Sequence, residues 1–291
     1  VPVDELVLEA AREVLRVHVP CLGERDVVID ARIRPGAPEL VGTFLRQSRT
    51  GIWLANDTSI GVGFAPRTRL EQAVGDVERH VDATRASHPE RGTDVKVMGA
   101  RRGESIGLTV ACAMVASEIA DTDAYRRACA SLQRDVAELA GTGDVTVNAA
   151  DDVENGELYL TVTGTSAESG DDGEAGRGNR ATGLITPMRP MTLESVAGKN
   201  PVSHVGKIYN IVAERIARAI VAEVEGVTGA EVFLVSRIGT PVRDPWVVHV
   251  RLRTDGELDP LAYRVEEIAR DLLARTEELA REIVGGKVPV F

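Results

Sequence analysis

An order of helix, strand, strand, helix and strand occurs twice along this chain, and it restricts the folds that the chain can adopt. The first copy is predicted over residues 68–163 and the second over residues 202–291. The two helices of each copy begin about 55 residues apart, which indicates an internal duplication. A helix over residues 4–17, followed by a buried strand over residues 26–33, fits the second half of an incomplete third copy. Strands with helices on one side predict an α+β fold of repeated two-layer units, the first unit incomplete.

Hydrophobic periodicity, capping residues and turn residues predict the individual elements. Helices are expected over residues 4–17, 38–46, 68–85, 122–140, 202–225 and 260–283, strands over 26–33, 95–101, 105–115, 145–148, 157–163, 230–236, 245–253 and 288–291, and a loop over 87–94. Asp4, and either Asp121 or Thr122, are the expected N-caps. Gly61 and Gly63 would allow another backbone to approach closely.

The stretch of residues 158–210 alternates carboxylates with cations along a Gly-rich backbone. Its acidic residues include Glu168, Asp171, Asp172 and Glu174, and its basic residues include Arg177, Arg180, Lys199, His204 and Lys207. This pattern suits a polyphosphate that Arg and Lys hold, with a divalent metal bridging it to carboxylates. The alternative is a solvated acidic loop with surface ion pairs.

Composition argues against several classes of protein. With 43% hydrophobic and 27% charged residues among 291, the chain has the balance of a globular protein. No apolar run reaches about 18 residues, the length of a membrane span, and the acidic amphipathic start is unlike a signal peptide. Three widely spaced cysteines, Cys21, Cys112 and Cys129, predict a reduced, cytoplasmic location. The net charge of −11 argues against a nucleic-acid partner.

Six motifs along the chain carry a resemblance to a known family. They read DVVIDARI, LANDTSIGVGFAP, DVKVMG, GTSAESGDDGEAGRGNR, LITPMRP and AGKNPVSHVGKIYN. In sequence and in order they closely resemble archaeal-type methionine adenosyltransferase (S-adenosylmethionine synthetase), over essentially the whole chain. The resemblance implies three similar, intertwined α+β units: a remnant of the first with a connecting segment in residues 1–66, the second in 67–165, and the Gly-rich loop with the third in 166–291.

The resemblance also implies an activity. The family joins the sulfur of L-methionine to C5′ of ATP, expels the tripolyphosphate, and hydrolyses it to phosphate and pyrophosphate before release. This chemistry requires the sulfur to be aligned behind C5′ and the leaving group to be stabilised by cations, without a protein nucleophile. Mg²⁺ and K⁺ as cofactors, and a homodimer with active sites at its interface, belong to the same expectation.

Residues in three of the motifs are expected to bind the substrates. The resemblance makes Asp57 a ligand of the methionine ammonium, and a turn residue is the alternative. Asp94 and Lys96 lie two residues apart on a strand, so their side chains share one face. The resemblance implies that this pair binds ATP, with the lysine on phosphate, whereas the alternative is an edge ion pair. Arg32 and Gly36 belong to a loop that the resemblance places at ATP.

The Gly-rich loop is expected to supply catalytic and metal-binding residues. Asp171 matches the acidic residue that the family places near the metal and methionine, and Asp172 shares or replaces it in that role. Arg177 matches a catalytic arginine on the polyphosphate, and Arg180 is a second candidate for that contact.

The segment before the long helix is expected to complete the polyphosphate site. Lys199 matches the polyphosphate lysine of the family and is the third predicted catalytic residue. The segment is not a Walker A motif, because Leu193 occupies a position that would need Gly. His204 and Lys207 belong to the archaeal form of the motif, and for His204 a structural role at the start of the helix is an equal alternative.

One motif of the family is absent from the sequence. The N-terminal third of the family carries a G-H-P-D segment that serves the phosphates and a magnesium ion, whereas the one His-Pro pair here, His88-Pro89, lies in the predicted loop. Either about 100 residues of the family's length have been removed, or the chain is a degenerate paralogue. The alternative function is therefore a catalytically incompetent homologue that binds nucleotide or polyphosphate or regulates an intact synthetase. A transferase acting on another thioether is a third interpretation.

Overall fold

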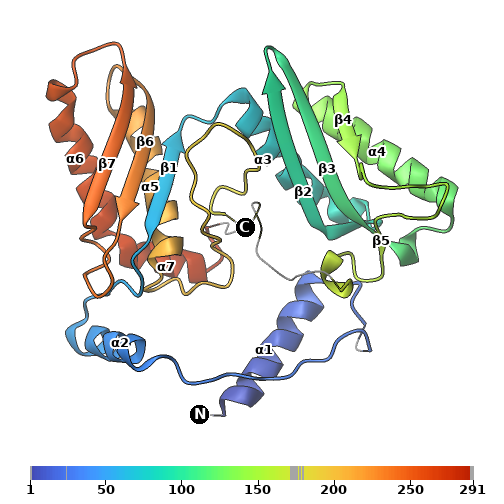
Figure 1. Cartoon of the computed structure of the whole chain (residues 1–291), viewed down its shortest axis with the longest axis horizontal. Coiled ribbons are helices and arrows are strands. Elements are labelled where there is room, and N and C mark those ends of the chain that lie inside the picture. Colours follow the sequence, from blue (N-terminus) through green and yellow to red (C-terminus); the bar gives the residue numbers. More distant parts are fainter. Residues whose placement is uncertain (1, 24, 171–175, 177, 179, 289–291) are drawn as a thin grey trace. The chain divides into compact units, whose positions relative to one another are not determined.

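The computed structural model describes residues 2–23, 25–170, 176, 178 and 180–288. The chain divides into two compact units, each formed by segments that are not contiguous in sequence. Unit 1 contains Val1–Pro35, Arg69–Glu174 and Leu184–Pro187, and unit 2 contains Gly36–Thr68, Ala175–Gly183 and Met188–Phe291. Each unit combines helices with one sheet (Figure 1), which confirms the expected α+β class. The expected division into three units stays a prediction.

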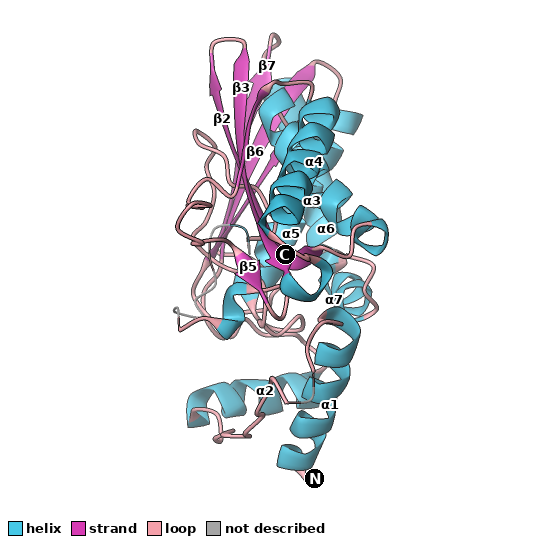
Figure 2. Ribbon diagram, turned by 90° about the vertical axis from the view of Figure 1, so that its right-hand side faces the viewer, coloured by secondary structure: helices cyan, strands magenta, loops and turns pink. Residues whose placement is uncertain are grey.

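Unit 1 is built on a four-stranded sheet with two helices on one face (Figure 2). Its elements are α1 (Val3–His18), α3 (Arg69–Thr84), η1 (Arg85–Ser87), β2 (Arg91–Arg102), β3 (Ser105–Val115), η2 (Ala116–Glu118), α4 (Thr122–Ala140), β4 (Asp144–Val147), β5 (Leu160–Thr161) and η3 (Ser166–Glu168). Strand β3 pairs antiparallel with β2 and parallel with β4 and β5. Val74 of α3, Val97 of β2 and Leu132 of α4 are buried and belong to the apolar core of this unit.

Unit 2 is built on a three-stranded antiparallel sheet with the order β1-β6-β7. Its elements are α2 (Pro38–Thr50), β1 (Ile60–Ala65), α5 (Val205–Glu223), β6 (Val227–Val235), β7 (Val247–Thr254), α6 (Asp259–Ala274) and α7 (Thr276–Val284). Helix α5 is buried along most of its length, and Tyr209, Ile216 and Ile220 on this helix are completely buried in the hydrophobic core. Helix α5 is therefore the central element of unit 2.

The predicted repeat is present in the order of the elements. Unit 1 contains α3–β2–β3–α4, and unit 2 contains α5–β6–β7–α6. The two strands pair antiparallel in both cases. Strand β4 follows as the fifth element in unit 1, whereas the strand predicted over residues 288–291 lies outside the described residues except for its first position.

Two glycines of β1 let α5 pack directly against the backbone of the strand. A Cβ atom on Gly61 would lie 2.3 Å from the carbonyl carbon of Tyr209, and one on Gly63 would lie 2.0 Å from the amide nitrogen of Glu214. These distances leave no room for a side chain, so the close approach predicted from this glycine pair is confirmed. The side chain of Asn210 on α5 accepts the amide hydrogen of Val62, with 3.0 Å between nitrogen and oxygen. This bond joins the helix to the strand.

Residues 26–33 do not form the buried strand that their hydrophobicity predicts. All eight positions are described, none belongs to a strand, and Val28 is 94% exposed. An apolar run becomes a strand only where a neighbouring strand takes up its backbone hydrogen bonds. No strand among the described residues pairs with this segment.

Several predicted boundaries also change. Strand β2 begins at Arg91, inside the predicted loop, and β5 covers only Leu160–Thr161 of the strand predicted over residues 157–163. The helix predicted over residues 260–283 is interrupted at Arg275, which separates α6 from α7. Strand β1 was not predicted, because its two glycines weaken the pattern of a strand.

The two predicted helix N-caps have different outcomes. Pro2 precedes α1, so Asp4 lies in the first turn of that helix and does not cap it. Asp121 is the N-cap of α4, and its carboxylate accepts the amide hydrogen of Ala124 at 2.7 Å. Of the two residues proposed for this cap, Asp121 is therefore correct and Thr122 is the first residue of the helix.

Candidate active site

Asp94 and Lys96 form an ion pair on β2 of unit 1. The Lys96 ammonium lies 2.5 Å from Asp94 Oδ1, while Asp94 Oδ2 accepts hydrogen bonds from the hydroxyl groups of Tyr159 at 2.9 Å and Ser166 at 2.6 Å. Burial of the Asp94 carboxylate opposes ionisation, but the hydrogen bonds from Lys96, Ser166 and Tyr159 outweigh it and lower its pKa. The carboxylate is therefore held ionised. The Lys96 side chain remains 49% exposed.

Glu168 fixes the start of the Gly-rich loop. Its carboxylate accepts the amide hydrogens of Val162 at 2.9 Å and Thr163 at 2.7 Å, and the hydroxyl hydrogen of Thr163 at 2.7 Å. Burial raises the pKa of Glu168, but the hydrogen bonds from Thr163 and Val162 together outweigh burial and lower the pKa. The carboxylate therefore stabilises the turn that leads into the loop.

The remaining candidates of the loop are only partly covered by the structure. Asp171, Asp172 and Arg177 lie outside the described residues. Arg180 is described, is partly buried, and accepts the amide hydrogen of Gly183 through its backbone carbonyl at 2.9 Å. The roles expected for these four residues stay predictions.

A lysine cluster, which we define as Glu194, Lys199, His204 and Lys207, lies in unit 2 where the chain enters α5. The Lys199 ammonium lies 3.0 Å from Glu194 Oε1, and the hydroxyl of Ser59 donates to Glu194 Oε2 at 3.3 Å. The Glu194 side chain packs so closely on α5 that a Cβ atom at Gly206 would lie 2.6 Å from its Cγ. Glu194 thus connects Lys199 to the first turn of the helix.

His204 is the N-cap of α5. Its Nδ1 accepts the amide hydrogen of Gly206 at 3.2 Å. Burial and the charge of Lys199 lower the pKa of His204, and the carboxylates of Glu194 and Asp57 oppose this shift. The ring is held in its neutral form, which an accepting nitrogen requires.

Lys207 is a buried cation in the first turn of α5. Lys207 is only 6% exposed, and among the described residues no carboxylate forms an ion pair with its ammonium. Burial and the nearby charge of Lys199 both lower its pKa. The amide groups at a helix N-terminus also carry partial positive charge. At this end of α5, the Lys207 ammonium is therefore a positive charge that no ion pair among the described residues neutralises.

Asp57 lies at the exposed end of the segment that leads into β1. Its Oδ1 accepts the amide hydrogen of Thr58 at 2.7 Å, and its carbonyl oxygen accepts the hydroxyl hydrogen of Ser236 at 2.9 Å. Because its carboxylate influences the pKa of His204, it belongs to the same region of unit 2 as the lysine cluster.

Arg32 and Gly36 lie on the segment between α1 and α2. The Arg32 side chain is 80% exposed and pairs with Asp30, with 2.6 Å between nitrogen and oxygen. Gly36 lies immediately before Ala37, which is the N-cap of α2. Neither residue contacts the Asp94–Lys96 pair or the lysine cluster through a described hydrogen bond or ion pair.

Sequence reasoning missed three residues that hold the predicted ones in place. Glu194 pairs with Lys199, and Tyr159 and Ser166 bind Asp94. Ser166 lies within a motif that carries the family resemblance, and Glu194 lies between two such motifs. Their place in or beside these motifs was the one indication in the sequence that they belong to a site. Tyr159 gave none, because a tyrosine in a strand pattern is read as a packing residue.

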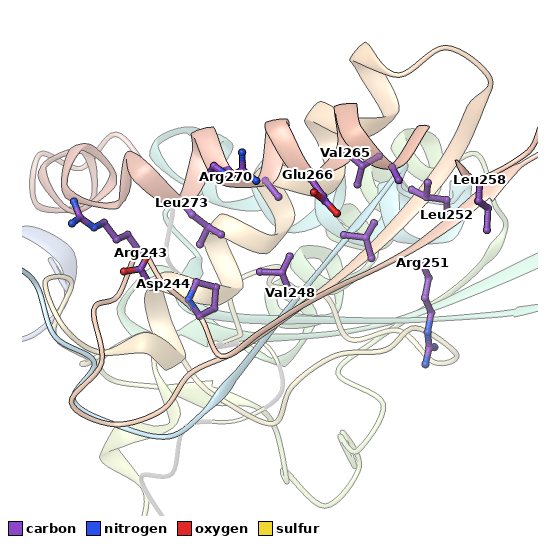
Figure 3. A pocket seen from close by; sticks show the side chains of 14 residues that line it. Arg243, Asp244, Val248, Arg251, Leu252, Leu258, Val265, Glu266, Arg270 and Leu273 are labelled. Carbon is purple, nitrogen blue, oxygen red and sulfur yellow. The ribbon is translucent and has the colours of Figure 1, made fainter. Parts of the chain in front are cut away.

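A cavity of about 880 Å³ lies between β7 and α6 of unit 2 (Figure 3). Its walls are mostly apolar, with Val248, Leu252, Val265 and Leu273 among the lining residues, and charged side chains such as Arg270 at its border. None of the predicted site residues lines it. This cavity is therefore distinct from the two polar sites described above.

Among the described residues, no group of three or more His, Cys, Asp or Glu side chains is arranged to hold a metal ion. No helix in the described part of the chain has the length and apolarity that crossing a membrane requires.

Comparisons with known proteins identify the family. The family model described as S-adenosylmethionine synthetase (AdoMet synthetase) matches residues 1–287. The S-adenosylmethionine synthase of Pyrobaculum aerophilum is 46% identical over 100% of this chain and 75% of its own length. The probable S-adenosylmethionine synthase of Aquifex aeolicus and the S-adenosylmethionine synthase of Halobacterium salinarum are both 44% identical over the whole chain, and over 75% and 74% of their own lengths.

A solved structure supports the fold. It is an unusual S-adenosylmethionine synthetase from Campylobacter jejuni, similar with a TM-score of 0.52 at 17% identity, over 79% of this chain and 63% of that one. So low an identity shows the fold alone. The match of the family model over nearly the whole chain, together with the identities above 40%, shows that this chain belongs to the S-adenosylmethionine synthetase family.

Proposed function

We propose that this chain forms S-adenosyl-L-methionine from ATP and L-methionine and hydrolyses the expelled tripolyphosphate to phosphate and pyrophosphate. Its family makes it a methionine adenosyltransferase. The observation that supports the site is Lys207, a buried ammonium without a carboxylate partner among the described residues, near Lys199 at the N-terminus of α5. Neighbouring cations repel each other unless an anion binds them, and the reaction generates a polyphosphate.

Lys199 is proposed as the catalytic residue of the lysine cluster. Its ion pair with Glu194 fixes the ammonium before the substrate binds. Negative charge grows on the leaving group as the sulfur attacks C5′, so a fixed ammonium stabilises the transition state more than the ground state. Arg177, outside the described residues, is proposed to act on the same polyphosphate, and Asp171 is proposed to act near methionine and the metal.

The other candidates are proposed to bind the two substrates. Lys96 binds a phosphate of ATP while Asp94 orients its ammonium, as the 2.5 Å contact between the two side chains supports. Arg32, Gly36 and Arg180 are further proposed ATP contacts, and His204 and Lys207 bind the polyphosphate region. Asp57, an exposed carboxylate near the lysine cluster, is proposed to bind the methionine ammonium.

Mg²⁺ and K⁺ are the proposed cofactors. Mg²⁺ in nucleotide sites is bound by one or two carboxylates and the phosphates of the substrate. The carboxylates of Asp171 and Asp172 have the donor chemistry for that role, and bound Mg²⁺ neutralises phosphate charge. The active enzyme is proposed to be a cytoplasmic homodimer with its active sites at the interface.

The test is chromatographic detection of S-adenosylmethionine after the chain is mixed with ATP, L-methionine, Mg²⁺ and K⁺. We expect product, and we expect Lys207→Ala to lower its rate of formation while Lys287→Ala, an exposed matched control, leaves the rate unchanged. Absence of product together with binding of tripolyphosphate would instead identify a catalytically incompetent homologue. Faster reaction with ethionine than with methionine would show that the acceptor is another thioether.

A further inference from the structure

The carboxylate of Asp94 is bound on both oxygens, and two of its partners belong to no predicted site. Oδ1 pairs with Lys96 at 2.5 Å. Oδ2 accepts the Tyr159 hydroxyl at 2.9 Å, the Ser166 hydroxyl at 2.6 Å and the Ser166 amide at 3.3 Å. A carboxylate with three donors on one oxygen has a single orientation, so the direction of Oδ1 is fixed as well.

Tyr159 is itself attached to the buried part of unit 1. Its amide donates to Asp151 Oδ1 at 2.9 Å, and its carbonyl oxygen accepts the amide hydrogen of Met114 on β3 at 2.9 Å. Asp151 Oδ2 in turn accepts the hydroxyl of Tyr125, which is 1% exposed on α4. The backbone of Tyr159 is therefore held by hydrogen bonds on two sides, so its side chain and hydroxyl extend from a fixed position.

The hydroxyl of Tyr159 remains a donor over the physiological pH range. Burial and the charge of Asp94 raise the pKa of Tyr159 to about 12. Ser166, the first residue of η3, contributes both its hydroxyl and its amide to the same oxygen of Asp94. The two donors come from different segments, so either one alone leaves the carboxylate less constrained.

We infer that Tyr159 and Ser166 are positioning residues that hold Asp94 so that its Oδ1, the oxygen paired with Lys96, directs the Lys96 ammonium toward a phosphate of ATP. The inference rests on the proposed role of Asp94 and Lys96 at ATP. Without the two donors the carboxylate rotates, the ammonium loses its direction, and ATP binds more weakly. The binding of methionine, for which Asp57 is proposed, does not depend on this orientation.

Two variants test the inference, Tyr159→Phe and Ser166→Ala. Each removes one hydrogen bond to a charged group, so we expect the KM for ATP to rise about 10-fold while the KM for methionine changes less than about twofold. The matched controls are Tyr263→Phe on α6, where the tyrosine is 76% exposed, and Ser117→Ala, where the serine is exposed in η2. Equal increases in both KM values would overturn the inference, because they indicate general damage to the enzyme.

A double-mutant cycle separates this inference from the proposed function. In the Asp94→Asn background, Tyr159→Phe should change the KM for ATP by less than about twofold, because its partner carboxylate is gone. A full 10-fold effect in that background would show that Tyr159 acts independently of Asp94. If Asp94→Asn alone leaves the KM for ATP unchanged, the proposed role of Asp94 is wrong, whatever Tyr159 does.

The cycle does not depend on one variant folding. Thermal unfolding identifies a variant that is lost to misfolding, and Ser166→Ala, which removes only an oxygen on the partly buried η3, provides the same cycle with Asp94→Asn. Independent effects of Ser166 and Asp94 on the KM for ATP would overturn the inference in that case.

Discussion

At the scale of single residues, the ammonium of Lys199 is shared between a carboxylate of the protein and the polyphosphate proposed as its ligand. Glu194 Oε1 lies 3.0 Å away and also takes part in a contact with Ser59 through its second oxygen. The carboxylate orients the lysine, and the charge that develops on the leaving group exceeds that of one carboxylate. We therefore propose that Lys199 contributes most in the transition state.

Replacing Lys199 tests this assignment. Lys199→Ala should lower kcat by about 10²-fold or more, because a preorganised charge-assisted contact to the leaving group is lost. Steady-state formation of S-adenosylmethionine measures the change, with Lys287→Ala as the control for loss of a lysine from an exposed position. An unchanged kcat in Lys199→Ala would mean that the ion pair with Glu194 is only structural.

The neutral ring of His204 makes the start of α5 sensitive to acid. Burial, together with the charge of Lys199, lowers the pKa of His204 below the ordinary value of about 6.5, so the unfolded chain binds the proton more readily than the folded one. The stabilisation is complete above that value and is lost as the pH falls from it through the lower pKa of the folded state. The Tm of the wild type should fall more between pH 7 and pH 5 than that of His204→Asn.

The choice of asparagine keeps the helix capped without a titrating group. The two proteins differ at this position alone, so the difference between their Tm profiles belongs to His204. Parallel profiles would show that protonation of His204 does not affect folding.

The sequence predicted which residues carry charge near the start of α5, but it did not predict how that charge is balanced. Lys199, His204 and Lys207 are close in sequence, and one helical turn brings the last two onto neighbouring positions. Glu194 reaches Lys199 only because the chain between them forms turns of irregular structure. Periodicity does not encode such turns, which is why the partner of Lys199 and the partners of Asp94 became visible only in three dimensions.

At the scale of elements, the contact between β1 and α5 depends on the absence of two side chains. Gly63→Ala would place a Cβ atom 2.0 Å from the backbone of Glu214, where the neighbour is main chain and cannot rotate away. We expect a loss of about 3 kcal/mol of unfolding free energy, at the upper end for overpacked cores. Chemical denaturation measures this loss.

Gly143→Ala is the matched control for this substitution. No atom lies within 4 Å of the position of its Cβ, so its effect should stay within about 0.5 kcal/mol. A loss at Gly63 no larger than the loss at Gly143 would show that α5 shifts away from β1 at little cost.

Elements with a clear hydrophobic period were predicted well, whereas elements defined by tertiary context were not. Helices α3 and α4 and the β2–β3 hairpin agree with their predicted ranges within a few residues, because a long amphipathic period specifies its own geometry. Residues 26–33 contain an apolar run, Val27 to Ile29, but pair with no strand among the described residues. Strand β1 was missed because its two glycines weaken the pattern of a strand. It forms nevertheless, and α5 packs directly against those glycines.

At the scale of the whole molecule, the chain combines a net charge of −11 with a site proposed for a polyanion. The overall field repels such a ligand, so binding depends on the local cations at the N-terminus of α5. At 100 times its Kd, tripolyphosphate should stabilise the fold by about 2.7 kcal/mol and raise the Tm by about 5 °C.

Differential scanning fluorimetry measures this stabilisation without any turnover. Orthophosphate at the same concentration is the control, because it carries less negative charge than tripolyphosphate and so gains less from the local cations. Lys207→Ala should lose most of the shift. Equal shifts with the two anions would indicate a general salt effect in place of a site.

The pairing of β1 with β6 determines when unit 2 can be completed during synthesis. Ile60 pairs with Val235, and the segments Arg69–Glu174 and Leu184–Pro187 of unit 1 are made between them. On the ribosome, the backbone hydrogen-bonding groups of β1 that pair with β6 therefore have no partner until the whole intervening segment has emerged. The apolar side chains of Val62 and Phe64 stay uncovered for the same time. Such a delay exposes a nascent chain to aggregation. The order of translation therefore leaves β1 without its partner strand while α3 to β4 can already fold.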